Sequence, residues 1–424
     1  MKLFLKFISS VALLFAAIAQ SLAQDGIVAT PDHANGVYRE GETVHWQIKV
    51  TGDDADSVSE IAYTIKKGGL TQTAEGTLSL NHGEGTLTGS LDQPGTLLAS
   101  FKAGSRKGLG GAIFAPEKIK GGAPCPDDFD AFWSGKLKDL AAIPPNPLLT
   151  SAPSDKPEVD YSKITFDNIN GTHVQGQIAR PKSGEKFPAL LQVQYAGVYP
   201  LQKSWVTDLA AKGWLAMNIM AHDLPIDQPE EFYKQQAAGP LKNYTTIGSE
   251  SRETSYFVRM FLGCVRAAEY LSSRPDWDGR TFVVTGTSQG GLQSFVTAAL
   301  FPKVTAVIVE VPAGCDPNAS DAGRAFGWPY WAASHSDKVM ETSRYFDAVH
   351  FAARTKCPLL VGVGLIDTTA PVGAVYAAFN AAPGPKEIVP MPLGDHKRAH
   401  EAFHPRRNAW LKALVTGAVP LVTK

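Results

Sequence analysis

Two patterns of apolar and polar positions divide the chain. Between residues 25 and 112, segments such as 43–50 and 61–65 alternate apolar and polar side chains, the period of a strand with one buried face. Turns rich in Gly, Asp and Asn separate these segments. Short strands at this spacing predict an immunoglobulin-like β-sandwich. No cluster of candidate acids, bases or nucleophiles falls in this part, so we expect the chemistry to lie in the rest of the chain.

Beyond the glycine-rich stretch at residues 108–111, strand and helix patterns alternate to the end of the chain. Nearly continuous apolar runs, typical of parallel strands buried on both faces, lie at 189–195, 214–221, 281–286, 304–311 and 358–365. Helical spacing occurs at 127–140, 204–212, 256–272, 289–300 and 371–381. The alternation predicts a doubly wound, mostly parallel α/β sheet over residues 113–424.

The first residues have the pattern of a targeting segment. Lys2 and Lys6 precede an apolar run at residues 7–19, and Ser21 and Ala23 place small side chains at the positions that a signal peptidase reads. We therefore expect a signal peptide over residues 1–23 and a secreted or periplasmic mature protein. The alternative is a membrane anchor, but the run is short for a span of ~20 residues, and no later stretch is apolar enough.

Charge and cysteine usage limit the partners. The chain has 40 Lys and Arg against 41 Asp and Glu, a formal net charge of −1, which gives no electrostatic reason to expect nucleic acid or an anionic membrane. The four cysteines are scattered without a Cys-x-x-Cys pair, so no zinc site is expected. Cys264 and Cys357 fall in apolar patterns and are interpreted as small core residues.

Ser288 lies where a buried strand runs directly into an apolar helix. The residues from Gly286 to Gly290 read Gly-Thr-Ser-Gln-Gly, the Gly-x-Ser-x-Gly turn that exposes a nucleophilic serine in α/β-hydrolases. Glycine is needed on both sides because a side chain would collide with the neighbouring strand and helix. An ordinary serine in a tight turn is the alternative, and the strand and helix flanks favour the nucleophile.

A serine nucleophile needs a base, and the base needs a carboxylate. In this fold the chain order is Ser, then acid, then His. Asp367 follows a buried strand, and His396 lies in the loop after the last strand. Asp395 adjoins His396, but adjacent side chains rarely point together, so Asp367 is the predicted acid. A helix N-cap is the alternative role for Asp367.

Two further histidines leave a metal-binding alternative. His396, His400 and His404 are spaced by four residues and would share one face of a helix. No paired Glu or Cys cluster accompanies them, and the serine machinery already uses one histidine. We therefore do not expect these histidines to bind a metal ion.

The oxyanion hole needs two backbone N–H donors. We expect one from Gln289, the residue after the nucleophile, and the other from Val198, in the loop after the strand that ends at Tyr195. Tyr195 should form part of the substrate pocket. Trp328, with neighbouring aromatic residues at 330 and 331, is a candidate for stacking on a sugar ring, and core packing is the alternative.

Residues from about 120 to 415 resemble the acetyl xylan esterase and cephalosporin-C deacetylase family, carbohydrate esterase family seven. The resemblance rests on the serine motif together with Tyr-Phe-Val-Arg at 256–259, Asp-Trp-Asp-Gly-Arg at 276–280, Val-Pro-Ala-Gly-Cys-Asp at 311–316, Tyr-Phe-Asp-Ala-Val-His-Phe-Ala-Ala at 345–353, Gly-Leu-Ile-Asp-Thr at 364–368, Asn380 and Lys-Glu-Ile at 386–388. Counting on from that Lys-Glu-Ile, the catalytic histidine of the family falls on His396. The β-rich residues 25–112 lie outside the resemblance.

The resemblance implies deacetylation of acetylated xylo-oligosaccharides and similar small acetyl esters, without a metal or cofactor. Family members are commonly hexamers, and an added N-terminal domain could block that packing. This chain departs from the family at three motifs. The family's Arg-Gly-Gln is replaced at residues 221–224, its His-Gly-Tyr reads Ala-Gly-Val at 196–198, and its His-Glu reads His-Lys at 396–397. These departures leave substrate range and homo-oligomer formation open.

Three other functions are alternatives. A general small-acyl carboxylesterase would use the same machinery. A serine peptidase of the prolyl-oligopeptidase kind carries a propeller, and residues 25–112 are too few for repeated blades of ~40–45 residues each. A sugar-binding protein on an inactive hydrolase scaffold would not need a complete triad.

Overall fold

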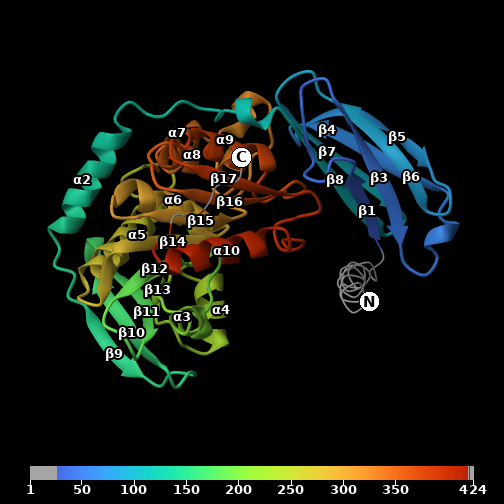
Figure 1. Cartoon of the computed structure of the whole chain (residues 1–424). Helices are drawn as coiled ribbons and strands as arrows, with labels where there is room; N and C mark the ends of the chain where they lie inside the picture. Colours follow the sequence, from blue (N-terminus) through green and yellow to red (C-terminus); the bar gives the residue numbers. More distant parts are fainter. Residues whose placement is uncertain (1–25, 419, 421–424) are drawn as a thin grey trace, which may run out of the picture.

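The computed structural model describes residues 26–418 and 420, and its largest element is a nine-stranded mixed sheet (Figure 1). The strand order is β17-β16-β15-β14-β12-β13-β11-β10-β9. Six of these strands, β12 to β17, pair in parallel. They span Phe187–Val193, Leu215–Ile219, Trp277–Thr287, Ala306–Glu310, Leu359–Gly364 and Lys386–Met391. The predicted, mostly parallel α/β sheet is therefore confirmed.

Three antiparallel strands extend one edge of this sheet and were not predicted. They are β9 (Leu148–Ala152), β10 (Val159–Asp167) and β11 (His173–Pro181). Strand β9 is the outermost strand, and most of its side chains are exposed. An edge strand with so little burial has no continuous apolar run, which is why its sequence did not stand out.

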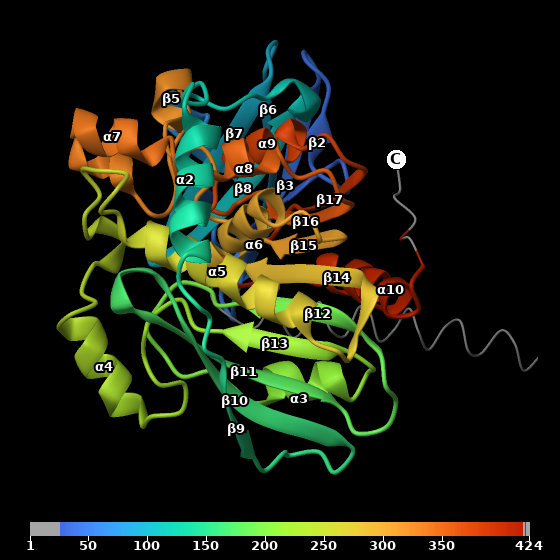
Figure 2. The same ribbon diagram turned by 90° about the vertical axis from the view of Figure 1, so that its left-hand side faces the viewer.

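Helices cover both faces of the sheet (Figures 1 and 2). One face packs against α2 (Phe129–Ala141), α5 (Tyr256–Ser273), α6 (Gln289–Leu300), α8 (Ala348–Ala352) and α9 (Val372–Ala381). The other face packs against α3 (Ser204–Ala210) and α10 (Phe403–Val415). Helices α4 (Glu230–Ala238) and α7 (Asp337–Ser343) lie in the connections. Because strand side chains alternate, Leu191 points to the first face and Leu190 to the second.

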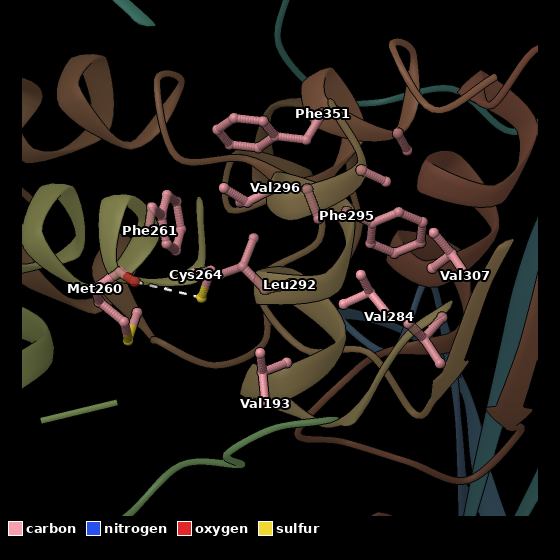
Figure 3. Close-up of a cluster of buried hydrophobic side chains, with 14 of the residues drawn as sticks. Val193, Met260, Phe261, Cys264, Val284, Leu292, Phe295, Val296, Val307 and Phe351 are labelled. Carbon is pink, nitrogen blue, oxygen red and sulfur yellow. Dashed lines mark hydrogen bonds between the residues drawn. The ribbon is translucent and has the colours of Figure 1, made fainter. Parts of the chain in front are cut away.

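The centre of the larger core lies between α5, α6 and the sheet (Figure 3). Leu292 and Phe295 of α6 and Phe261 of α5 are fully buried there. Cys264 is buried beside them, and its Sγ lies 3.4 Å from the carbonyl oxygen of Met260. All four cysteines are free, and Cys357 is only partly buried. This packing fixes the position of α6, which begins directly after Ser288.

Strands β1 to β8, which we call the N-terminal sheets, form two further sheets with a core of their own. One sheet has the order β1-β3-β6 and the other β2-β8-β7-β4-β5. Trp46 is fully buried in this core, and its Nε1 donates to the carbonyl oxygen of Gly111 at 3.1 Å. The strands span Gly26–Pro31, Val37–Tyr38, Thr43–Thr51, Glu60–Lys67, Thr71–Ser79, Glu84–Ser90, Gly95–Ala103 and Arg106–Phe114.

The N-terminal sheets pack directly on the end of β16. A Cβ atom added to Gly111 would lie 2.3 Å from the carbonyl oxygen of Leu365, and one added to Gly36 would lie 3.0 Å from the Leu365 side chain. Strand β8 continues to Phe114, past the expected boundary at residue 112, and Ile113 belongs to the larger core. The glycine-rich stretch at 108–111 is therefore a strand interior that permits close packing rather than a linker.

The predicted signal peptide, residues 1–23, lies outside the described residues. Within residues 26–418 and 420, no helix has both the length and the apolar character needed to cross a bilayer.

A substitution at Gly111 should disturb the hydrolase part from a distance. Gly111→Ala places a methyl group against the backbone oxygen of Leu365, two residues before Asp367, so that one of the two surfaces must move. We expect a lower melting temperature and a lower kcat on an acetyl ester. Gly135→Ala in α2 is the control, because its added Cβ meets nothing within 4 Å. An unchanged melting temperature and an unchanged kcat in Gly111→Ala would show that this contact contributes to neither stability nor activity.

Candidate active site

Ser288 occupies a strained turn between β14 and α6. Its φ of 58° and ψ of −122° are rare for a residue with a side chain. A Cβ on Gly286 would lie 2.4 Å from the backbone of Gly290, a Cβ on Gly290 2.7 Å from the oxygen of Val193, and a Cβ on Gly291 2.5 Å from Pro312. The glycines thus let the turn fit between the ends of β12 and β15, and the turn holds the Ser288 hydroxyl above them.

His396 links Ser288 to Asp367. Its Nε2 lies 2.8 Å from the Oγ of Ser288, and its Nδ1 lies 2.7 Å from an Oδ of Asp367. The carboxylate of Asp367 is fully buried, and its other oxygen accepts from the backbone N–H groups of Thr369 and Ala370, both at 2.8 Å. Since a carboxylate only accepts, Nδ1 carries the proton and Nε2 is free to accept from the serine.

Backbone hydrogen bonds hold the acid and base loops together. The N–H of Ile366 donates to the oxygen of Gly394 at 3.2 Å, and a Cβ on Gly364 would lie 2.3 Å from that same oxygen. Asp395 turns away from His396, and its side chain accepts from the N–H groups of Lys397 and Arg398. Asp395, the neighbour in sequence, therefore stabilises the loop, whereas the carboxylate of Asp367 faces the imidazole of His396.

A buried glutamate beneath the serine turn was not predicted. The backbone oxygen of Glu310, at the end of β15, accepts from the N–H of Ser288 at 3.0 Å. Its carboxylate lies 3.0 Å from Nδ1 of His400 and 3.1 Å from Nε2 of His404, with Arg407 at 4.0 Å. One sign of this site was present in the sequence, a charged residue near the end of the apolar run at 304–311. Its partners, however, lie about ninety residues away in sequence.

These contacts set the charges of the Glu310 cluster. Burial opposes ionisation of Glu310, but the hydrogen bond from His400 and the neighbouring positive charges hold its pKa below the ordinary value. The hydrogen bond to Glu310 raises the pKa of His400. The Nε2 of His400 also lies 2.7 Å from the backbone oxygen of Asp395, so His400 ties the loop that carries His396 to the strand under Ser288.

The three histidines do not form a metal site. His396 faces Asp367, whereas His400 and His404 share Glu310. No group of three or more His, Cys, Asp or Glu side chains placed to hold a metal ion occurs in the part of the chain that the structure describes. The regular spacing is broken because only His404 lies in α10, and the other two precede it in a loop.

The loop after β12, residues 194–199, lies beside the serine turn. The strand ends at Val193, two residues earlier than predicted. The carbonyl oxygen of Gln194 accepts from Nε2 of Gln293 in α6 at 2.8 Å. Tyr195 is 43% exposed and stacks on Tyr199 with ring centroids 4.6 Å apart. Val198 is partly buried against a small apolar cluster.

The predicted sugar-stacking aromatics separate in the structure. Trp328 is partly buried and stacks on Phe257 of α5 with ring centroids 5.8 Å apart, which is the core-packing alternative. Trp331 is buried, and its Nε1 donates to the oxygen of Thr245 at 2.8 Å. Tyr330 is exposed. Of these three aromatic residues, Tyr330 is the exposed one, and Trp328 contributes to packing.

Comparison with known proteins identifies the family. The model of the acetyl xylan esterase family matches residues 117–414, so this chain belongs to that family and is a carboxylic ester hydrolase. Acetyl esterase Axe7A of Xylanibacter ruminicola is 29% identical over 401 residues, an alignment that covers 92% of this chain and 90% of the relative. An alignment of that extent reaches well into the N-terminal sheets, which the family model leaves out.

Two solved structures share the fold of the hydrolase part. Acetyl xylan esterase 1 from Thermoanaerobacterium sp. JW/SL YS485 has a TM-score of 0.62 at 23% identity and covers 70% of this chain and 97% of its own. The acetyl xylan esterase from Paenibacillus sp. R4 has a TM-score of 0.58 at 24% identity, with the same coverage of both chains.

The Glu310–His400 pair predicts a pH-dependent stability. Glu310 has a lowered pKa and His400 a raised one, so the ion pair is complete between these two values. It is lost as the pH falls through the pKa of Glu310 or rises through that of His400. Glu310→Gln should therefore lower the melting temperature most near pH 6 and less at pH 9. The measurement is thermal unfolding across this range.

His404→Asn is the control for this prediction, because the His404 side chain is 49% exposed and an exposed partner contributes less. A melting loss in Glu310→Gln that does not vary with pH would contradict the ion pair.

Proposed function

We propose that this esterase removes acetyl groups from carbohydrate esters by a serine acyl-enzyme mechanism, with Ser288 as nucleophile, His396 as base and Asp367 as orienting acid. The observation that carries the proposal is the pair of contacts at one imidazole, 2.8 Å to Ser288 and 2.7 Å to Asp367. Membership of the acetyl xylan esterase family and the relative named an acetyl esterase support the choice of acetyl esters.

The first half of the reaction acylates the enzyme. Nε2 of His396 takes the proton of the Ser288 hydroxyl as the oxygen attacks the acetyl carbonyl carbon. The developing oxyanion is bound by the N–H groups of Gln289 and Val198 and by the N-terminal end of α6. The imidazolium then gives its proton to the sugar oxygen, which leaves as an alcohol.

The second half regenerates the serine. A water molecule gives a proton to His396 and attacks the acetyl-Ser288 carbonyl. As the second oxyanion collapses, the imidazolium returns that proton to the departing Ser288 oxygen, and acetic acid is released. Asp367 accepts the hydrogen bond from Nδ1 of His396 and stabilises the imidazolium in both halves. No step requires a metal or an organic cofactor.

Three further features belong to the proposal. Residues 25–112 are proposed to form a separate immunoglobulin-like sandwich domain that precedes the hydrolase domain, and the apolar core around Trp46 supports this. A signal peptide directs the protein out of the cytoplasm. The exposed ring of Tyr195 lines the approach to Ser288, supported by its place in the loop beside the serine turn.

Removal of the nucleophile tests the mechanism. Ser288→Ala should lower kcat on p-nitrophenyl acetate by ~10³–10⁶-fold, because only binding and the oxyanion hole remain. Ser272→Ala in α5 is the matched control, since it deletes another buried serine hydroxyl that bonds only within its own helix. His396→Ala should be as inactive as Ser288→Ala, and EDTA should leave the wild type unaffected. A Ser288→Ala variant that keeps a tenth of the activity would overturn the mechanism.

Acyl-chain selectivity tests the substrate class. A pocket shaped for acetyl should reject added methylenes, each misfit costing ~1–3 kcal/mol or roughly 10–200-fold. With p-nitrophenol as the common leaving group, kcat/KM should fall steeply from acetate to butyrate, and acetylated xylan should release acetate. Equal or rising kcat/KM toward butyrate would instead identify a general small-acyl carboxylesterase. The chain would then keep its mechanism and lose its proposed substrate.

A further inference from the structure

His222 lies behind the loop that carries the proposed oxyanion donor, in the connection after β13. Its side chain is buried, with 1% of its surface exposed. Nε2 lies 3.0 Å from the backbone oxygen of Gly197, and Nδ1 lies 2.7 Å from the hydroxyl of Tyr256. Nothing in the triad chemistry uses this imidazole.

The partners of His222 fix its tautomer. The oxygen of Gly197 can only accept, so Nε2 carries the proton and Nδ1 accepts from the Tyr256 hydroxyl. That hydroxyl in turn accepts from Nη2 of Arg259 at 2.6 Å, and the same Nη2 donates to the oxygen of Ala221 at 2.8 Å. In this series of hydrogen bonds every donor meets an acceptor. Each group donates to the next, from Arg259 through Tyr256 and His222 to the oxygen of Gly197.

The imidazole stays neutral at the pH of the reaction. Burial lowers the pKa of His222 to about 4, and the nearby Arg259 charge acts in the same direction. A neutral ring donates from one nitrogen and accepts at the other, which is the pattern that Gly197 and Tyr256 require.

Gln194 anchors both ends of the loop, and the backbone of Gly197 also bonds to the Tyr244 hydroxyl, which leaves the Gly197 carbonyl to His222. The side chain of Gln194 accepts from the N–H of Ala221 at 2.8 Å and donates to the oxygen of Tyr199 at 3.1 Å, which fixes the two ends. Gly197, between them, has a φ of 123°, open to glycine, and its carbonyl is held only by His222 among the bonds of the described residues. Without that bond the 197–198 peptide could rotate.

We propose that His222 is a positioning residue for the oxyanion hole, whose bond to the Gly197 carbonyl sets the direction of the Val198 N–H. In a trans peptide the C=O and N–H point opposite ways, so holding the oxygen toward His222 turns the N–H of Val198 away from it, toward the acyl oxygen. The inference rests on the proposed serine mechanism.

The same cluster reaches the second donor. Tyr244 packs edge-on against His222 with ring centroids 4.7 Å apart, and its hydroxyl donates to Oε1 of Gln289. One cluster of polar side chains therefore contacts both the loop after β12 and Gln289, the first residue of α6. A preorganised hole of this kind acts on the transition state more than on substrate binding.

Two amides separate the two nitrogens of His222. The amide nitrogen of Gln overlays Nε2 and can still donate to Gly197, whereas that of Asn overlays Nδ1 and cannot reach it. On p-nitrophenyl acetate, His222→Asn should lose ~10–100-fold in kcat with KM within about threefold, less than the ~10²–10³-fold cost of deleting a donor outright. His222→Gln should stay within about fivefold of the wild type. Equal losses in the two variants, or a change in KM alone, would overturn the proposal.

Tyr256→Phe tests whether the groups act in series. It should cost about threefold to tenfold in kcat, and adding it to His222→Asn should cost nothing more, because the bond it supports is already gone. Tyr161→Phe is the matched control, since the Tyr161 hydroxyl belongs to a buried tyrosine and donates to Gln177 of β11 instead. Should His222→Asn fail to fold, a kcat loss confined to Tyr256→Phe supports the proposal, and equal behaviour of both tyrosine variants overturns it.

Active-site titration with diethyl p-nitrophenyl phosphate keeps the two hypotheses apart. One equivalent of p-nitrophenol, with the phosphate on Ser288, is expected from the wild type and from each folded His222 variant. A wild type that is not phosphorylated at Ser288 would remove the proposed function itself. Normal titration together with wild-type kcat in His222→Asn would remove only the role of His222.

Discussion

The turn at Ser288 is the constraint on which the rest of the site depends. A left-handed φ of 58° between a strand and a helix puts the hydroxyl above the sheet, and only glycine at positions 286, 290 and 291 allows the neighbouring backbones to come as close as they do. The turn is tolerable because α6 is buried along most of its length. Its position also brings the ends of β12, β15, β16 and β17 to one place, which holds the proposed acid, base and oxyanion loop.

Three imidazoles near this turn are given different properties by their partners. His396 faces the buried carboxylate of Asp367 and the Ser288 hydroxyl, so it can exchange a proton in each direction. The pKa of His400 is raised by Glu310, which favours a structural cation. The pKa of His222 is lowered by burial, which favours a neutral donor. The same side chain is thus the proposed base, an ion-pair partner and the proposed hydrogen-bond relay, because burial and counter-charge differ.

Much of this arrangement was predictable from local sequence, and the rest was not. Helix α6 begins and ends at the predicted residues. The structure also brings together the predicted residues Ser288, Asp367 and His396, which the sequence offered in the chain order typical of this fold. Glu310 was missed because its carboxylate pairs with histidines that lie about ninety residues later in the sequence. The contact between Gly111 and Leu365 was missed for the same reason. Only the folded structure shows which backbone packs against a glycine that has no side chain in the way.

The loop after β13 shows how a departure from a family motif can be compatible with the same chemistry. Where the family has Arg-Gly-Gln, this chain has no arginine, yet the loop is held on three sides. Asp223 accepts from the N–H of His173 at 2.8 Å, the oxygen of Ala221 accepts from Arg259 of α5, and His222 reaches the Gly197 carbonyl. The cation is supplied from the adjacent helix rather than from the loop itself. A motif is therefore one way to meet a geometric demand, and the proposed mechanism requires only that the peptide facing the oxyanion keeps its orientation.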